Sequence, residues 1–209
     1  PKKKVNLKNQ VVAQIGTGSS GIQVVPEIAK SVKKLVIFQR TPNYSIPARN
    51  KKLTKEFISN FKKDYEKIKK RLRKTPGGHT FSFPKRSVFD FTIRERNKIY
   101  EKAWRKGSLS FRACFGDITK SLKANKTASK FIKEKILDTV NDKKVAKILT
   151  NFDHPFTSKR PTLNTNYYET FNRKNVELID LKTNPIIKIT RKGIKTKNDN
   201  FNFDKIIFA

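Results

Sequence analysis

Residues 11–23 of the chain are VVAQIGTGSSGIQ, and this stretch decides the fold class. The apolar residues 11–15 predict a short strand, and the glycine- and serine-rich residues 16–21 predict a turn. Apolar side chains recur at helical spacing over residues 22–32, and a second apolar run at residues 35–38 predicts another strand. Strand, turn, helix and strand in this order form a βαβ unit, which indicates an α/β fold.

The turn matches the pattern G-x-G-x-x-G with glycines at 16, 18 and 21. This pattern indicates dinucleotide binding only where it follows a strand and opens a helix, and both conditions are met in this sequence. Gly16 allows the tight turn, Gly18 lets the backbone approach a pyrophosphate, and Gly21 lets helix and strand pack closely. The alternative is an ordinary glycine-rich turn. We favour a dinucleotide site, whose phosphates lie at the N-terminus of the helix.

The end of the second strand indicates which dinucleotide binds. NAD sites place Asp or Glu there for the ribose 2′-hydroxyl, whereas this chain has Phe38-Gln39-Arg40-Thr41. Arg40 follows Gly21 by 19 residues, close to the spacing of about 20 that this fold uses. A guanidinium suits a 2′-phosphate, and Thr41 adds a hydroxyl donor. We therefore predict NADP(H), with an Arg40 that is merely exposed as the alternative.

The rest of the chain changes character twice. Two prolines and no periodicity predict a loop over residues 41–50, and residues 51–150 are mostly helical by pattern. The predicted helices cover residues 53–72, 93–104 and 124–149, the last as two helices split near Asn141-Asp142. We interpret their apolar stripes as core packing rather than as a membrane or nucleic-acid surface.

Strand signals return after residue 150. The predicted strands cover residues 176–181, 186–190, 193–196 and 203–209, the middle two as a hairpin. The simplest arrangement is a Rossmann-like NADP-binding domain interrupted by a mostly helical insertion. Its expected division is 1–50 for the first part of the domain, 51–150 for the insertion and 151–209 for the return to the domain.

The formal net charge is +32, from 49 Lys and Arg against 17 Asp and Glu. Such a charge is typical of nucleic-acid-binding proteins, so a basic nucleic-acid-binding module is an alternative from another class. That alternative requires a clustered basic surface with aromatic side chains on it. The lysines are instead spread along the whole chain, often beside asparagine, so we expect no specific nucleic-acid partner.

Other features exclude several kinds of site. No run of 18 apolar residues exists, so we expect no membrane span. His79 and His154 lack Cys, Asp or Glu at ligand spacing, so we expect no metal site. Cys114 is the single cysteine, and we interpret it as an inert buried thiol in a cytoplasmic protein.

Two features indicate a piece of a longer protein. The chain begins at Pro1 and contains no Met, and it ends in the apolar residues 206–209, which have the pattern of a strand. We therefore expect an internal piece.

Several stretches together resemble a known family, the class B flavin monooxygenases, and among these the Baeyer–Villiger type, such as cyclohexanone, phenylacetone and steroid monooxygenases. The resemblance lies in residues 15–23 and 38–50, in residues 103–118, in Lys159-Arg160-Pro161 and in residues 167–176. It implies FAD and NADPH as cofactors, and a small-molecule ketone and O₂ as substrates. One oxygen atom is inserted beside the carbonyl, and an ester or lactone forms.

The resemblance also implies roles for individual residues. The NADP pyrophosphate would be held by Thr17, Gly18, Ser19, Ser20, Gly21, Ile22 and Gln23. The 2′-phosphate would be held by Arg40, Thr41 and Lys159. Arg160 would be the catalytic arginine, whose cation stabilises negative charge at the reacting oxygen.

The sequence departs from the family pattern in two respects. The family usually has Asp four residues after this arginine, where this chain has Asn164, which puts the local hydrogen bonding in doubt. The family's flavin-binding glycine motif is not in these 209 residues, so we expect FAD to be bound mainly by parts outside the chain and the piece alone to be inactive. An N- or S-oxygenating flavin monooxygenase is the alternative. Residues 167–173 and the pair Lys159-Arg160 favour the Baeyer–Villiger type.

Overall fold

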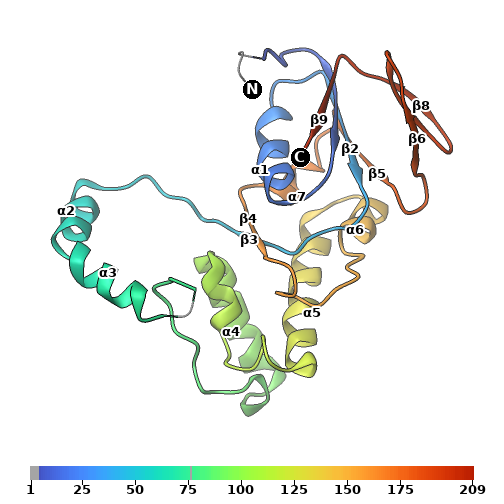
Figure 1. The fold of residues 1–209 in the computed structure, drawn as a ribbon. Helices are drawn as coiled ribbons and strands as arrows, with labels where there is room; N and C mark the ends of the chain where they lie inside the picture. The colour runs from blue at the N-terminus through green and yellow to red at the C-terminus, as the bar shows by residue number, and fades with distance from the viewer. Residues whose placement is uncertain (1–4, 76) are drawn as a thin grey trace.

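The computed structural model describes residues 5–75 and 77–209. Its centre is a parallel sheet in the order β5-β2-β1-β9 (Figure 1). The strands are β1 (Val11–Ile15), β2 (Lys34–Gln39), β5 (Val176–Asp180) and β9 (Lys205–Phe208). The helix α1 (Ser19–Ile28) connects β1 to β2. Because strands from both ends of the chain share one sheet, the predicted α/β fold interrupted by an insertion is confirmed.

The inner strands β1 and β2 are buried on both faces, as their near-continuous apolar sequences require. The helix α1 packs on one face of the sheet, where Val12 and Leu35 are both 0% exposed. Ala13 and Phe38 point to the other face, where they contact a small antiparallel sheet. That sheet consists of β6 (Ile186–Ile189), β7 (Gly193–Thr196) and β8 (Asn200–Asn202). The predicted hairpin of β6 and β7 is confirmed, while β8 was not predicted.

The chain between β2 and β5 contains most of the helices. The two longest are α4 (Ile93–Lys106) and α5 (Leu122–Thr139), and α6 (Lys143–Leu149) follows α5. The shorter elements are α2 (Lys55–Lys63), α3 (Tyr65–Arg73), α7 (Tyr167–Thr170) and 3₁₀ turns at Val88–Asp90 and Leu109–Ala113. The predicted break near Asn141-Asp142 is confirmed, because the Asp142 side chain accepts hydrogen bonds from the first backbone N–H groups of α6.

The helices α4 and α5 pack through buried aromatic side chains. Tyr100 lies 5.6 Å from Phe111 and 5.3 Å from Phe131 between ring centroids, and all three belong to the core that also includes Val12. The Tyr100 hydroxyl pairs with Thr127 Oγ1 at 2.7 Å, which satisfies its buried polar atom. The insertion therefore shares one apolar core with the parallel sheet.

Two local expectations were wrong in their boundaries. The helix after the glycine turn covers 19–28 rather than 22–32, because Gly18 already serves as its N-cap. The predicted loop at 41–50 contains the strand β3 (Ser45–Pro47), which pairs in parallel with β4 (Thr162–Asn164). No local pattern could indicate this strand, since its partner lies far along the chain. Neither β4 nor α7 was predicted.

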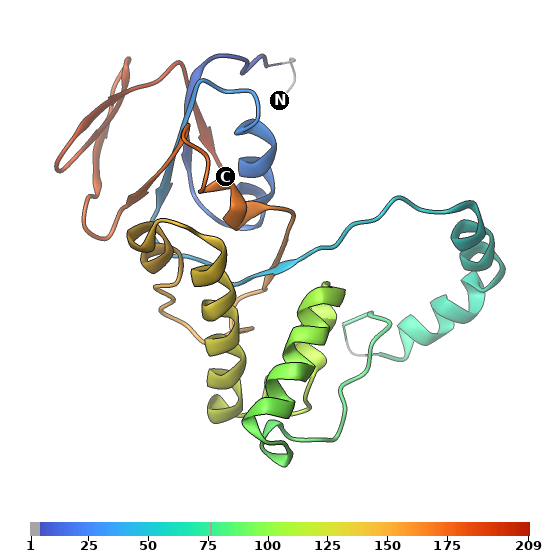
Figure 2. The same ribbon diagram turned by 180° about the vertical axis from the view of Figure 1, so that it is seen from behind.

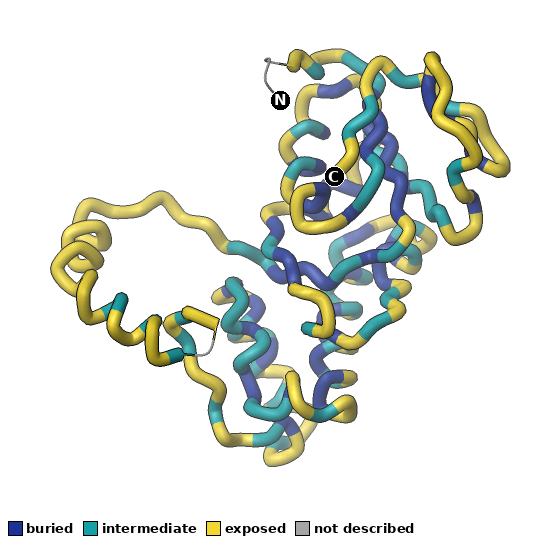
Figure 3. Tube along the Cα trace, viewed as in Figure 1, coloured by how far each residue is buried: buried dark blue, intermediate teal, exposed yellow. Residues whose placement is uncertain are grey.

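The expectation that the stripe over 53–72 packs into a core was also wrong. Two helices, α2 and α3, replace the single predicted one, and neither has a buried residue. Phe57 is 54% exposed and Phe61 44%, and their rings stack on each other with centroids 6.2 Å apart. Figures 2 and 3 show that the helices α2 and α3 stand away from the rest of the molecule. An amphipathic pattern predicts an apolar face, but it does not say what covers that face.

The close approach of α1 to β1 leads to a first prediction. A Cβ atom added at Gly21 would lie 2.5 Å from the carbonyl oxygen of Gly16 and 2.9 Å from Gln14 Nε2. Gly21→Ala should therefore lower the free energy of unfolding by about 1–3 kcal/mol, because backbone must move. Urea denaturation measures this change.

Gly18→Ala is the matched control, because a Cβ there would meet no atom within 4 Å. It should cost less than about 1 kcal/mol, the range expected for an exposed helix cap. Equal losses in the two variants would contradict the argument from close packing.

Candidate functional site

The glycine turn leaves the N-terminus of α1 open. Gly16 has φ of +105°, a conformation that favours glycine, and its N–H donates to Phe38 O at 3.1 Å. No side chain caps α1 at Gly18, so its first N–H groups have no side-chain acceptor. Such groups, together with the positive end of the helix dipole, attract anions.

Gln14 holds this turn together from within β1. Its side chain is 0% exposed, and its amide donates to Gly16 O at 3.1 Å and Gly21 O at 3.2 Å. One amide thus ties the beginning of the turn to its end. The sequence interpretation missed this role, although a lone amide in an apolar strand was the available signal.

A cavity of about 410 Å³ opens beside the turn. Its lining includes six of the predicted site residues: Gly16, Thr17, Gly18, Arg40, Thr41 and Lys159. Thr17 Oγ1 donates to Thr41 O at 3.3 Å, which joins the turn to the end of β2. Leu181, just after β5, completes the side next to β2. The fold therefore brings together residues that lie far apart in the sequence.

The other predicted site residues lie outside this lining. Ser19 and Ser20 are exposed in the first turn of α1, whereas Gly21 and Ile22 are buried against the sheet. Gln23 lines a separate cavity of about 360 Å³ with Ala48, Asn50 and Thr165.

Arg160 is exposed, and its side chain is not part of the 410 Å³ cavity. Its carbonyl oxygen accepts a hydrogen bond from Asn43 Nδ2 at 3.3 Å. The backbone of Arg160 is thus tied to the chain segment that follows β2.

The carboxylate of Asp153 lines a separate cavity of about 500 Å³ and contacts several groups, two of which, Thr41 and Lys159, line the 410 Å³ cavity. It accepts hydrogen bonds from His154 Nδ1 at 2.8 Å and from Thr41 Oγ1 at 3.4 Å. Lys159 Nζ and Lys182 Nζ each lie 3.8 Å from its oxygens. The hydrogen bond from His154 and the charges of the two lysines lower the pKa of Asp153. Sequence reasoning missed Asp153 and Lys182, because no motif contains them.

Asn164, the departure from the family pattern, has a local hydrogen-bond partner for each polar atom of its side chain. Its side chain is buried, Nδ2 donates to Ser45 Oγ at 2.7 Å, and Oδ1 accepts from the N–H of Tyr167 at 3.4 Å. Its carbonyl oxygen also accepts from Ala48 N at 2.8 Å. The amide therefore joins β3 to β4 and to the start of α7.

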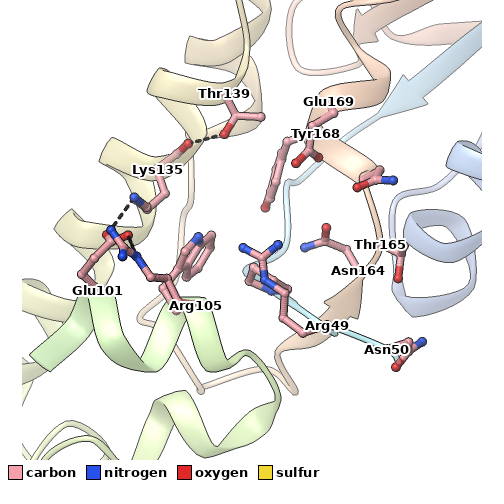
Figure 4. Close-up of a pocket in the computed structure, with 13 residues that line it drawn as sticks. Arg49, Asn50, Glu101, Arg105, Lys135, Thr139, Asn164, Thr165, Tyr168 and Glu169 are labelled. Carbon is pink, nitrogen blue, oxygen red and sulfur yellow. Dashed lines mark hydrogen bonds and ion pairs between the residues drawn. The ribbon is translucent and has the colours of Figure 1, made fainter. Parts of the chain in front are cut away.

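A larger cavity of about 540 Å³ lies between the insertion and the β3–β4 pair (Figure 4). Glu101 pairs there with Lys135 at 2.8 Å and with Arg105 at 3.0 Å. Arg49 points from the end of β3 toward Tyr168. None of the predicted cofactor-binding residues lines this cavity.

Other chemistry is limited among the described residues. No group of three or more His, Cys, Asp or Glu side chains within residues 5–75 and 77–209 is arranged to hold a metal ion. None of the described helices combines the length and apolar character that a membrane span requires. Cys114 is buried as predicted, and burial raises the pKa of its thiol to about 12.

The residues around the 410 Å³ cavity fit a dinucleotide that carries a 2′-phosphate. The space above Gly18 is open, since a Cβ there would meet no atom within 4 Å. Two cations, Arg40 and Lys159, line the side nearest the end of β2, and no carboxylate from β2 takes the place of an NAD-type acid.

The known proteins that are similar to this chain in sequence and in structure are monooxygenases. No family model matches the chain. Cyclohexanone 1,2-monooxygenase from Acinetobacter sp is 37% identical over 98% of the chain, and phenazine N-monooxygenase PhzNO1 from Lysobacter antibioticus is 32% identical over 98%. The solved structure of an oxidized steroid monooxygenase bound to NADP superposes with a TM-score of 0.94 at 38% identity, covering 100% of this chain and 40% of that one. The chain spans about 38% of the length of the curated relatives.

The Asp153 contacts lead to a prediction about pH. A lowered pKa in the folded state means that ionised Asp153 stabilises the fold above its ordinary pKa of about 4, and that this stabilisation is lost as the pH falls through the lowered value. A ¹³C NMR titration of labelled Asp carboxyl groups should place Asp153 below the ordinary value. Replacing both Lys159 and Lys182 by Met should raise its pKa, whereas an unchanged pKa would show that the lysines do not act on it.

Proposed function

This chain belongs to the Baeyer–Villiger monooxygenase family over the part of those proteins that it spans, and from this premise we propose that it forms the NADPH-binding part of a ketone-oxidising enzyme. The whole protein would use FAD and NADPH to insert one oxygen atom of O₂ beside a ketone carbonyl, giving an ester or lactone. NADPH supplies the reducing equivalents, and the second oxygen atom leaves as water.

The observation that carries the proposal is the cavity that joins the glycine turn to Arg40, Thr41 and Lys159. The turn and the open N-terminus of α1 would hold the pyrophosphate through backbone N–H groups. Arg40, Thr41 and Lys159 would hold the 2′-phosphate through charge-assisted hydrogen bonds. The end of β2 has no acidic residue, which supports NADP(H) rather than NAD or FAD in this cavity.

Arg160 would take the catalytic role. It follows Lys159 directly and is exposed, so its guanidinium is accessible from outside the 410 Å³ cavity. A permanent cation held beside the reacting atoms stabilises negative charge that develops on oxygen. FAD would be bound mainly by parts of the protein outside this chain, and the flavin supplies the oxygen activation when it is bound.

We also propose the division into residues 1–50, 51–150 and 151–209. The pairing of β1 and β2 with β5 and β9 supports one cofactor-binding domain made from the first and last parts. The insertion would then shape the region beside the reaction site, because α4 and α5 pack on the same core as the sheet.

A second candidate function is oxygenation of a ring nitrogen. A phenazine N-monooxygenase is among the relatives, so the cofactor-binding part of these proteins also serves nitrogen substrates. Incubating the full-length protein with a cyclic ketone and with an aromatic N-heterocycle distinguishes the two. Ester or lactone supports the first proposal, and N-oxide alone supports the second.

Arg40→Ala tests the cofactor assignment. The unmutated full-length enzyme should prefer NADPH to NADH, and the variant should lose most of this preference, because one charge-assisted contact to the 2′-phosphate is removed. The loss should be about 1.5–3 kcal/mol, roughly ten- to a hundredfold in kcat/KM for NADPH. Equal use of NADPH and NADH by the unmutated enzyme would overturn the assignment.

Arg160→Ala and Arg160→Lys test the catalytic role. The alanine variant should make no ester, and the lysine variant should make much less, because Lys lacks the planar fork of a guanidinium. Both should still bind NADPH, since Arg40, Lys159 and the glycine turn are unchanged. Ester formation and NADPH consumption are measured separately. Near-normal ester formation by Arg160→Ala would make Arg160 an ordinary surface charge.

A further inference from the structure

The 540 Å³ cavity is separate from the proposed cofactor cavity, since the two share no lining residue. It lies where three parts of the chain meet: the end of β3, the helices α4 and α5, and the segment that leads from β4 into α7 (Figure 4). Its charged lining residues are the cations Arg49, Arg105 and Lys135 and the carboxylates Glu101 and Glu169.

Two of the three cations are already neutralised. Glu101 pairs with Lys135 at 2.8 Å and with Arg105 at 3.0 Å, and the hydrogen bond from Lys135 lowers the pKa of Glu101. Arg49 is exposed, and it forms no ion pair with any residue in 5–75 or 77–209. Its guanidinium is therefore the lining cation that is available to an anion.

Tyr168 places a second hydrogen-bond donor opposite Arg49. The residue is 4% exposed, and its buried hydroxyl group donates to no acceptor in the part of the chain that the structure describes. Burial raises the pKa of Tyr168, so the hydroxyl stays protonated. Figure 4 shows the Arg49 side chain directed toward Tyr168. Because buried donors in proteins are normally paired, two donors that face each other indicate that an acceptor belongs between them.

The backbone holds Arg49 in this position. Its φ of +52° lies in the left-handed region, which residues other than glycine seldom adopt. The preceding Ala48 N donates to Asn164 O at 2.8 Å, which fixes the end of β3 against β4. Gly107, after α4, lies so near that a Cβ atom there would approach Arg49 Cγ to 2.5 Å. A backbone conformation of this kind, held by surrounding contacts, is typical of binding positions.

We propose that the 540 Å³ cavity binds a small molecule that carries a carboxylate, held between the Arg49 guanidinium and the Tyr168 hydroxyl. A guanidinium donates two parallel hydrogen bonds to a carboxylate, and the tyrosine O–H donates a third. Trp104, which is 8% exposed, supplies an apolar wall for the rest of the ligand. The ligand would touch both the insertion and the β3–β4 pair, and its binding would not depend on NADPH.

The test is calorimetric titration of the FAD-loaded full-length protein with benzoate and with benzamide. The two probes have nearly the same shape, and only benzoate is an anion. Benzoate should bind roughly tenfold or more tightly than benzamide, and saturating NADP⁺ should not change this ratio. Equal binding of the two probes would overturn the proposal. So would the absence of benzoate binding, which is the result expected if a carboxylate of the protein itself occupies the position.

Three variants locate the bound carboxylate. Arg49→Met should weaken benzoate binding roughly tenfold or more, and Tyr168→Phe roughly five- to tenfold, because each removes a donor to the carboxylate. Both should change benzamide binding much less. Glu169→Gln should strengthen benzoate binding several-fold, because a negative charge is removed from the lining.

Arg191→Met is the matched control, because Arg191 is an exposed arginine between β6 and β7, outside the cavity lining. It should leave the affinity for benzoate unchanged. Normal benzoate binding by Arg49→Met would show that benzoate binds elsewhere and would overturn the proposal. An equal loss of both probes in Tyr168→Phe would show that the hydroxyl supports only the fold, and would also overturn it. Either result would leave the cofactor assignment, which Arg40→Ala tests, unaffected.

Discussion

The contact between α1 and the end of β1 sets the geometry on which the rest of the site depends. Gly21 lies so close to Gly16 that a Cβ atom would approach its carbonyl oxygen to 2.5 Å, and the buried Gln14 amide bonds to both ends of the turn. The helix must therefore begin directly above the strand. Its uncapped N-terminus then faces the cavity that Arg40 and Lys159 line from the other side.

The second constraint is the return of the chain after a long insertion. The strands β1 and β2 form only the middle of the parallel sheet, and the outer strands β5 and β9 come from the part of the chain after the insertion. The short β3–β4 pair joins the two chain segments that flank the insertion. Asn164 supports this junction through Ser45 and Tyr167. The same junction brings Lys159, which lies shortly before β4, into the lining of the 410 Å³ cavity together with Thr41.

The positive charge is spread over the whole chain, but a few lysines also form a local cluster around one carboxylate. Most of the 49 Lys and Arg residues lie along the surface without a common target, but Lys159 and Lys182 converge on one carboxylate. Isolated surface charges contribute little to stability. The cluster around Asp153 is therefore a local arrangement of charge that the net charge of the chain does not indicate.

The sequence by itself determined the elements whose signal is local. The glycine turn, the two strands around it, the helix break at Asp142 and the hairpin of β6 and β7 all follow from spacing, capping and turn chemistry. Arg40 and Thr41 were predicted for the same reason, because they follow the turn at the spacing of one βαβ unit. Lys159 and Arg160 came from the family resemblance, since nothing local separates them from other basic residues.

Tertiary structure alone decided what depends on distant partners. The strand β3 exists because β4 pairs with it, and Asp153 and Lys182 meet only because β2, β5 and the end of the insertion converge. The helices α2 and α3 are a further example. Their sequence predicts an apolar stripe, but it does not show that no other element covers this stripe. Local propensity acts over a few residues, whereas contacts such as that between Thr41 and Asp153, 112 residues apart, arise from the packing of the whole chain.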